Sequence, residues 1–440
     1  MISLPKPRPF GLALSVAALA LAALAAPALA RGPLDERLAA IKAMIVAKPK
    51  IDATLFSPAL LAAVPPAKMK RFLTGVFAKA GRAVSIATLE RRGAHRGRFR
   101  VFGSKGSFPL RLGVEPRPPH RISALWIGNV VGNLRSLGEL VKRLRALPGA
   151  VSFALCELGG KTPRLRAQLG AHRRLAIGST FKLYLLGALV DDIARGRRRW
   201  ADTVRLPKAQ RSYPSGVLHR WPTGMPLSLA TLATQMISIS DNTATDVLLH
   251  LLGRERVEAM LPAMSALARN DARNVPLLST REMFLLKDDS AAGRRRRAAY
   301  LKASVAAKRR QLARLAKLPR RAFRGLSRAK PTAIDRIEWF ASAKELCRAM
   351  DWIRHHARGK ATLGRRLLAV NHGLAFRRDR WRFIGYKGGA EPGVLNLTWL
   401  LQDHKQRWWA LSAGFNDANK PLREKKLFAL MQSLVVLLER

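Results

Sequence analysis

The stretch from Ser179 to Ala194 is apolar on almost every side when it is drawn as a helix. A helix that is hydrophobic all round is stable only when most of its surface is buried, so the chain has to fold around this segment. The sequence has 440 residues and is 48% hydrophobic, whereas single hydrophobic cores rarely grow beyond about 250–300 residues. We therefore expect two domains, with this helix in the core of the second.

Apolar, strand-like segments lie at both ends of the expected second domain. One strand, Val151 to Leu158, comes near its start, and the others come near its end: Arg382 to Lys387, Val394 to Gln402 and Trp408 to Phe415. Helical patterns fill the sequence between them, and a closing helix is expected from Pro421 to Leu438. This order predicts an α/β domain over residues 135–440, in which strands from both ends share one sheet and a helical lobe lies between them.

Residues 31–134 show a different pattern. Two helical segments, Leu34 to Val46 and Pro58 to Ala80, come first. They are followed by short segments whose partly alternating polarity is typical of strands: Val84 to Glu90, Arg98 to Phe102, Phe108 to Val114 and Arg121 to Val131. Helices followed by a run of strands predict an α+β accessory domain.

The N-terminus has the pattern of a secretory signal. Lys6 and Arg8 precede an apolar run from Phe10 to Ala26, and Ala28-Leu29-Ala30 is a small-residue cleavage pattern. We predict a signal peptide over residues 1–30 that is cleaved after Ala30, and hence a periplasmic or secreted protein. The alternative is an uncleaved membrane anchor, because the run approaches the roughly 20 residues that span a bilayer.

The chain has only two cysteines, Cys156 and Cys347. After export they either pair in an oxidising compartment or remain two free buried thiols. Two cysteines cannot form a thiolate zinc cage, and the nine histidines show no metal-ligand spacing. We therefore predict no metal and no cofactor.

The net charge of +52 predicts long-range attraction to polyanions. Positive charge is densest from Arg294 to Lys330, inside an expected basic helical insertion at about residues 288–332. Such a run is commonly a solvated face, and the functional alternative is a surface for an anionic envelope polymer. Specific binding of nucleic acid is not expected, since few aromatic residues are interspersed with the basic ones and the protein is predicted to be exported.

The pattern Ser-x-x-Lys occurs at Ser3, Ser179 and Ser327, but only Ser179 opens an apolar helix. Residues three apart share one helix face, so Lys182 should lie beside Ser179. A serine at a helix start sits where the helix dipole favours developing negative charge. Burial lowers the pKa of an amine and makes it a base near neutral pH. We predict that Ser179 is a nucleophile and Lys182 its general base.

Two further motifs carry polar groups suited to acyl transfer. In Ser240-Asp241-Asn242, Ser240 can relay a proton, Asn242 can donate to a substrate amide carbonyl, and Asp241 is interpreted as a structural cap. In Lys387-Gly388-Gly389-Ala390, Lys387 can bind a substrate carboxylate and the glycines let a substrate backbone come close. The amides of Ala390 and Ser179 are then candidates for an oxyanion hole.

The three motifs, in this order, resemble the motif set of class A β-lactamases and penicillin-binding proteins. The resemblance extends from about Leu140 to Arg440 and is strengthened by the segment Met236 to Asp246. It implies a β-lactamase/transpeptidase-like sandwich with the nucleophile between its lobes, and an acyl-enzyme mechanism.

Two features depart from this family. Its lactamases carry a loop glutamate that activates the deacylating water, but residues 270–280 contain no glutamate. Gly388 also replaces the hydroxyl residue that normally follows the strand lysine. Weak or no β-lactam turnover is therefore expected.

A narrower resemblance is to the two-domain lactamase-like hydrolases associated with clavulanic acid gene clusters. It rests on the basic insertion, on Thr280 to Phe284, on Glu338-Trp339-Phe340 and on the α+β N-terminal domain. It implies that residues 31–134 form a cone like that of nuclear transport factor 2 or cystatin.

The sequence thus predicts a serine hydrolase that acts through an acyl-enzyme on an ester or β-lactam-like carbonyl. One alternative is a genuine class A β-lactamase or a cell-wall peptidase. Another is a non-catalytic protein that binds penicillin or an envelope polyanion.

Overall fold

The computed structural model describes residues 32–160, 162–318 and 330–439. The predicted signal peptide and residues 319–329 of the predicted basic insertion, which include Ser327, lie outside these ranges. No helix in the described ranges has both the length and the apolar character needed to cross a membrane.

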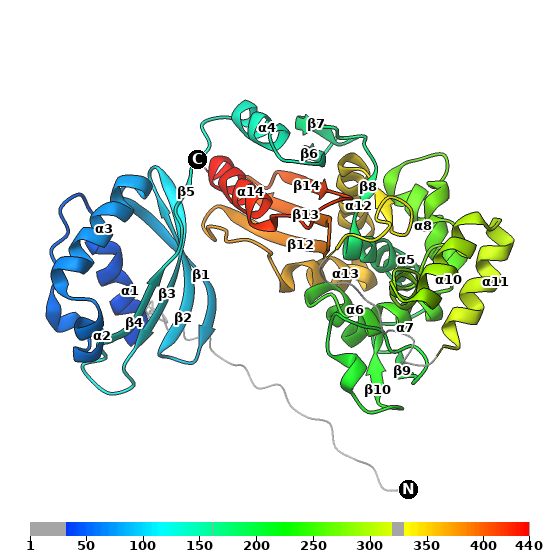
Figure 1. Ribbon diagram of the computed structural model, residues 1–440, viewed down its shortest axis with the longest axis horizontal. Helices are drawn as coiled ribbons and strands as arrows, with labels where there is room; N and C mark the ends of the chain where they lie inside the picture. The colour runs from blue at the N-terminus through cyan, green and yellow to red at the C-terminus, as the bar shows by residue number, and fades with distance from the viewer. Residues whose placement is uncertain (1–31, 161, 319–329, 440) are drawn as a thin grey trace, which may run out of the picture.

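The N-terminal part begins with helices and continues with an antiparallel sheet in the order β1-β2-β3-β4, with β5 paired to β3. Its elements are α1 (Pro33–Met44), α2 (Pro58–Ala63), α3 (Pro66–Ala80), β1 (Ala83–Arg92), β2 (Arg96–Gly103), β3 (Gly106–Val114), β4 (Ile122–Ile127) and β5 (Val131–Gly132). The helices cover one face of the sheet, and the other face is turned toward the rest of the molecule (Figure 1). This agrees with the predicted α+β class.

Two boundaries in this part differ from prediction because of proline and loop geometry. The expected helix Pro58 to Ala80 is divided into α2 and α3. Pro65 and Pro66 lie at the break, where their rings prevent continuous helical hydrogen bonding. The expected strand Arg121 to Val131 is likewise divided into β4 and β5.

The second part is built on a five-stranded antiparallel sheet in the order β12-β13-β14-β6-β7. Its strands are β6 (Ala150–Leu158), β7 (Arg164–Leu169), β12 (Trp381–Glu391), β13 (Val394–Asp403) and β14 (Trp408–Asn416). Strands from the two ends of this region therefore do share one sheet, as predicted. β7 was missed by the sequence analysis.

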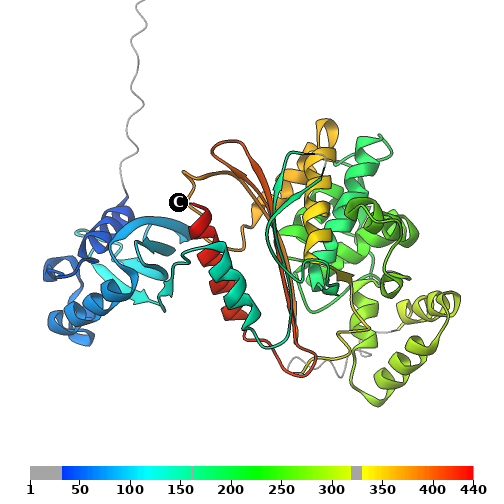
Figure 2. The ribbon, with the colours of Figure 1, turned by 90° about the horizontal axis from the view of Figure 1, so that it is seen from above.

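Helices pack on both faces of this sheet (Figure 2). On one face, α4 (Leu137–Arg145) and α14 (Glu424–Leu438) bury their apolar sides with Phe153, Leu155 and Trp399. On the other, Ala154 and Cys156 meet α5 (Lys182–Ala194) and α12 (Ala343–His356). The alternation of neighbouring β6 residues between two cores is the expected period of a strand.

The remaining helices form the lobe between the two sets of strands. They are α6 (Leu229–Ser238), α7 (Asn242–Leu252), α8 (Arg254–Ser265), α9 (Thr280–Leu286), α10 (Ala291–Lys302), α11 (Val305–Ala316) and α13 (Thr362–Leu367). Short strand pairs accompany them: β8 (Leu175–Ala176) with β11 (Phe340–Ala341), and β9 (Thr203–Arg205) with β10 (Pro226–Ser228). The expected helix Ile337 to Ala357 is in fact β11 followed by α12.

The two cysteines are close together in the core. Cys156 on β6 and Cys347 on α12 are both buried and free, and the Cys347 thiol lies 3.8 Å from the carbonyl oxygen of Ala154. The two thiols are neighbours, and no disulfide joins them in this structure.

Candidate active site

Ser179 lies in a single 3₁₀ turn, η2 (Gly178–Phe181), directly before the start of α5 at Lys182. Ser179 was predicted on the first turn of the helix, and the structure places it in a 3₁₀ turn directly before that helix. Either position puts the serine at the positive end of the α5 dipole. No described residue is hydrogen-bonded to the Ser179 hydroxyl through an interaction within the chain.

Aromatic packing fixes this turn. The Phe181 ring stacks on the Trp339 ring with 3.7 Å between their centroids. Trp339 accepts a hydrogen bond of 2.9 Å from Ile177 N, and its indole donates to the carbonyl oxygen of Leu278 at 2.9 Å. Trp339 belongs to the Glu338-Trp339-Phe340 segment, but its contact with Phe181 was not predicted from the sequence.

Lys182 is fully buried and donates to three oxygen atoms of the Ser240-Asp241-Asn242 turn. Its Nζ lies 2.7 Å from the carbonyl oxygen of Ser240, 3.1 Å from Ser240 Oγ and 2.7 Å from Asn242 Oδ1. Burial, followed by the nearby charge of Lys387, lowers the pKa of Lys182 well below its usual value. This is the direction that a general base requires.

The Ser240 turn joins α6 to α7 and is held by Asp241. The Asp241 carboxylate caps α7 by accepting from Ala244 N at 2.9 Å, which confirms its predicted role. It also accepts from Val217 N at 2.6 Å and Leu218 N at 2.8 Å. Ser240 itself has a φ of 59°, an uncommon value for a non-glycine residue that marks a tightly constrained turn.

Asn242 is the first residue of α7 and uses both ends of its amide. Its Oδ1 accepts from Lys182, and its Nδ2 donates to the carbonyl oxygen of Tyr213 at 3.0 Å. Because the amide nitrogen carries two hydrogens, one remains for the substrate carbonyl that we predict Asn242 to bind.

Lys387 reaches the same hydroxyl from β12. Its Nζ donates to Ser240 Oγ at 3.1 Å and also contacts the carbonyl oxygen of Gly388. Burial lowers the pKa of Lys387 to about 7. The structure therefore brings Lys182, Ser240, Asn242 and Lys387 together in one hydrogen-bonded cluster.

Glycine lets the edge strand β12 approach the Ser179 turn. A Cβ on Gly389 would lie 2.5 Å from Ser179 N and 2.2 Å from the carbonyl oxygen of Ile177. A Cβ on Gly178 would lie 3.3 Å from Ala390 N. These contacts place the two backbones side by side, in the arrangement expected of an oxyanion hole formed by the amides of Ser179 and Ala390.

Tyr386 is a residue near the site that sequence reasoning missed. A Cβ on Gly388 would lie 2.0 Å from Tyr386 Oη, so the phenol occupies the space beside the glycine that replaces the family's hydroxyl residue. Residues two apart on a strand share a face. The spacing of Tyr386 and Gly388 was therefore an available signal.

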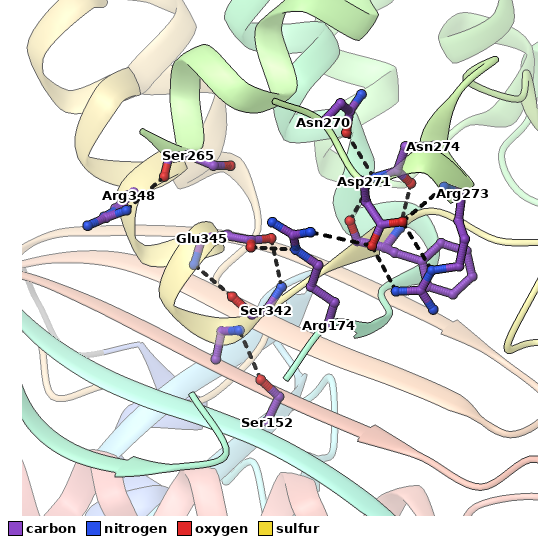
Figure 3. A network of polar contacts seen from close by, with 12 residues as sticks. Ser152, Arg174, Ser265, Asn270, Asp271, Arg273, Asn274, Ser342, Glu345 and Arg348 are labelled. Atoms are coloured by element: carbon purple, nitrogen blue, oxygen red, sulfur yellow. Dashed lines mark hydrogen bonds and ion pairs between the residues drawn. The ribbon is translucent and has the colours of Figure 1, made fainter. Parts of the chain in front are cut away.

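The segment that lacks the family's glutamate contains Asp271, which is held by arginines (Figure 3). Its carboxylate pairs with Arg273 at 2.8 Å and with Arg174 at 3.7 Å, and Arg174 also pairs with Glu345 of α12 at 2.7 Å. Although burial by itself would raise the pKa of Asp271, the bonds from Arg273 and the two positive charges lower it. A paired carboxylate of this kind is a weak base.

Glu391 is a second acidic residue near the site, and it directly follows Ala390 of the predicted oxyanion hole. Its carboxyl group is buried, contacts Lys287 Nζ and lies beside Glu338, which accepts from the same Nζ at 2.8 Å. Burial and the neighbouring Glu338 raise the pKa of Glu391. Asp246, near Lys182, accepts from Thr280 N at 2.7 Å and Arg281 N at 2.9 Å. These acidic groups are occupied by structural contacts.

The described residues contain no group of three or more His, Cys, Asp or Glu side chains arranged to hold a metal ion. That the protein binds no metal ion remains a prediction.

Comparison with known proteins agrees with this site. Residues 137–318 match the family model described as the beta-lactamase enzyme family. The matched segment is less than half of the chain and contains Ser179, Lys182, Ser240 and Asn242, so it is this segment that is similar to the β-lactamase family. No curated protein matches the chain by sequence.

Solved structures similar to the chain include β-lactamases and a protein described as PBP-A. The β-lactamase of Sphaerobacter thermophilus is 18% identical, with a TM-score of 0.46, and the match covers 69% of this chain and 96% of that one. The β-lactamase of Francisella tularensis is 13% identical, with a TM-score of 0.47, and the match covers 69% of this chain and 98% of that one. The protein described as PBP-A is 12% identical, with a TM-score of 0.47, and the match covers 69% of this chain and 95% of that one.

Proposed function

We propose that this protein hydrolyses small acyl esters or β-lactam-like amides, with Ser179 as nucleophile, Lys182 as general base and Ser240 as proton relay. The observation that carries the proposal is the Ser240 hydroxyl, which accepts hydrogen bonds from two buried amines, Lys182 and Lys387. A hydroxyl held in this way can pass a proton between a base and a leaving group.

In the first half-reaction, Ser179 Oγ forms a bond to the substrate carbonyl carbon and its proton passes to Lys182. The amides of Ser179 and Ala390 stabilise the oxyanion, and Asn242 and Lys387 bind the substrate's amide and carboxylate. Collapse of the intermediate breaks the bond to the leaving group, which takes a proton through Ser240. Water then reverses these steps and releases the acid.

We propose that β-lactams acylate Ser179 but that the resulting acyl group is released slowly. Asp271 is paired with arginines and Glu391 is buried beside Glu338, so neither is free to activate water in the way of the family's loop glutamate. A small ester leaves an acyl group that allows water to approach Lys182 and Ser240. The ratio of deacylation to acylation should then be much lower for a penicillin or cephalosporin than for a short-chain ester.

The test combines a stopped-flow burst with a chromogenic cephalosporin, steady-state hydrolysis of a nitrophenyl ester, and intact mass spectrometry. We expect a burst of one equivalent and a persistent adduct with the cephalosporin, together with turnover of the ester. Fast multiple turnover of the cephalosporin without an adduct would instead identify a genuine β-lactamase. Absence of both an adduct and turnover would favour a non-catalytic binding protein.

We propose a separate role for the basic helices α10 and α11 as a surface for an anionic envelope polymer. Arg294, Arg295 and Arg310 are exposed there, whereas Arg309 is neutralised by Glu255 and Glu258 at 2.6 Å each. Binding of a teichoic-acid-like polyphosphate should fall steeply with added salt, and replacing the exposed arginines with glutamine should weaken it.

We also propose the predicted processing and domain plan: a signal over residues 1–30, an accessory domain over 31–134 resembling the nuclear transport factor 2 or cystatin cone, and a catalytic domain over 135–440. A plan of this kind is similar to that of the lactamase-like hydrolases of clavulanic acid gene clusters. Edman or mass analysis of the exported protein should find Arg31 at its N-terminus. Retention of residues 1–30 in the membrane fraction would favour the anchor.

A further inference from the structure

The open face of the N-terminal sheet carries an unusual set of side chains. Along β2, Phe99 and Val101 point into the N-terminal core, whereas Phe102 packs on Ala375 and Val436 of the catalytic part. Because strand side chains alternate between faces, Arg98 and Arg100 share the side of Phe102. Two arginines therefore face the catalytic part, next to the apolar contact that joins the two parts.

A cleft of about 1220 Å³ lies between this sheet face and the catalytic part. Arg98, Arg100 and Trp126 line it on one side, and Val370, Arg378 and Lys425 line it on the other. Small-molecule sites are common at domain interfaces, and typical pockets measure about 300–1,000 Å³. This cleft is large enough for a ligand of drug size. Ser179, Lys182 and Ser240 do not line it.

Arg100 is the group in the cleft that most requires a ligand. Burial lowers its pKa to about 10. Its Nη1 donates to Ser107 Oγ at 3.3 Å, its Nε is buried without a hydrogen-bond partner, and no described carboxylate forms an ion pair with it. A buried charge that lacks a counter-ion is costly, and an anion would offset that cost.

The other charged side chains that line the cleft also leave an excess of positive charge. Glu90 is a lining carboxylate, but it is paired with Arg92 at 2.6 Å and with Arg98 at 3.1 Å. Arg378, Lys425 and Lys426 add positive charge from the catalytic side. Guanidinium groups bind carboxylates and related oxyanions through parallel hydrogen bonds.

Apolar groups in the same cleft are exposed to an extent that is uncommon for large side chains. Leu89 is 42% exposed, Trp126 is 49% exposed and Val370 is 57% exposed. Exposed apolar surface rimmed by polar groups is typical of a ligand-binding groove. An inorganic anion would satisfy the arginine but would leave this surface in water.

We propose that the cleft binds a small organic anion with an apolar body, whose acidic group pairs with Arg100 and whose body lies against Trp126 and Val370. The site is distinct from the serine site but adjoins it. Asn371, which follows Val370, donates to the carbonyl oxygen of Ser238 at 3.0 Å, two residues before Ser240. The Gly373 backbone lies against the Tyr386 ring, next to Lys387.

The test is isothermal titration calorimetry of the full chain with 2-naphthoate and with its uncharged analogue 2-naphthamide. We expect 2-naphthoate to bind with 1:1 stoichiometry and at least tenfold more tightly than the amide. Arg100→Gln should weaken naphthoate binding at least tenfold, and Trp126→Ala should weaken both ligands. The measurement is independent of catalysis, so it stands whether or not Ser179 acts as proposed.

Arg145→Gln is the matched control, because it removes the same charge from an exposed position on α4 outside the cleft. It should leave naphthoate affinity within twofold of the parent value. An equal loss in this control would show general attraction to a highly basic chain and would overturn the proposal. The proposal would also be overturned if 2-naphthamide bound as tightly as 2-naphthoate, or if Arg100→Gln left naphthoate binding unchanged. Absence of 1:1 binding of 2-naphthoate would overturn it as well.

Discussion

The Ser240 hydroxyl lies between two buried amines, and this arrangement governs their protonation. Burial lowers the pKa values of both lysines, and the charge of Lys387 lowers that of Lys182 further. Lys387, whose pKa is lowered to about 7, therefore titrates near neutral pH.

Ser179→Ala should abolish formation of any acyl adduct, because it removes the nucleophilic oxygen while leaving the turn intact. Intact mass after incubation with benzylpenicillin would measure this. Ser327→Ala is the matched control, since it removes a serine that also has a lysine three positions later and should leave the adduct unchanged. An adduct of parental yield on the Ser179 variant would assign the nucleophile elsewhere.

The pKa of Lys387, lowered to about 7, predicts opposite pH behaviour for anionic and neutral substrates. Lys387 holds a substrate carboxylate only when protonated, so kcat/KM for β-lactam acylation should fall as the pH rises through about 7. A neutral nitrophenyl ester does not need this charge. Its kcat/KM, which reports groups of the free enzyme, should not fall over the same range.

Lys387→Arg keeps its charge at these pH values and serves as the control for that profile. Its profile for the anionic substrate should be flat near neutral pH. A fall that persists in the arginine variant would place the titrating group at another residue.

At the scale of elements, the approach of β12 to the Ser179 turn depends on glycine. Gly389→Ala should lower kcat/KM for the ester at least tenfold, because the added carbon would overlap backbone atoms of Ile177 and Ser179, which cannot rotate away as a flexible side chain can. Displacing β12 moves the Ala390 amide from its predicted oxyanion position, and loss of one such donor costs about 10²–10³-fold. Steady-state kinetics would measure the change.

Gly75→Ala is the matched control for this change. Gly75 lies inside α3, and a Cβ there would meet nothing within 4 Å. The substitution should leave kcat/KM unchanged and stabilise the helix by about 0.5–1 kcal/mol. Equal activities for the two alanine variants would show that β12 does not need its close approach.

At the scale of the whole molecule, the two parts meet through a small apolar contact. Phe102, Ala375 and Val436 form it, and Ser433 Oγ donates to the carbonyl oxygen of Gly132 at 3.1 Å nearby. This contact also forms one wall of the cleft that is lined by Arg98 and Arg100. The relative position of the parts therefore controls whether Arg100 faces Val370.

Phe102→Ala should loosen this arrangement, because truncating a buried phenylalanine removes about 3–5 kcal/mol of stabilisation. We expect a larger radius of gyration in small-angle X-ray scattering. Phe72→Ala, on a side chain that is 50% exposed on α3, should leave the scattering unchanged. If the two variants scatter alike, contacts other than Phe102 hold the parts together.

The sequence by itself determined the groups of the site and the class of the fold. Ser179 with Lys182, and Ser240 with Asn242, are recognisable because each pair is close in the chain and local periodicity places it at a helix start. The apolar strands at both ends of the second region likewise predicted one shared sheet, because each buries two faces and needs neighbouring strands.

Tertiary structure decided the contacts between residues that are distant in the chain. Lys387 bonds to Ser240 across 147 positions, and Lys287 meets both Glu338 and Glu391. The 3₁₀ turn at Ser179 depends on Trp339, and the anion cleft depends on how a sheet face meets a loop near Val370. Local patterns specify which faces are buried, but packing of complete elements sets which buried faces meet, and these distances follow from packing alone.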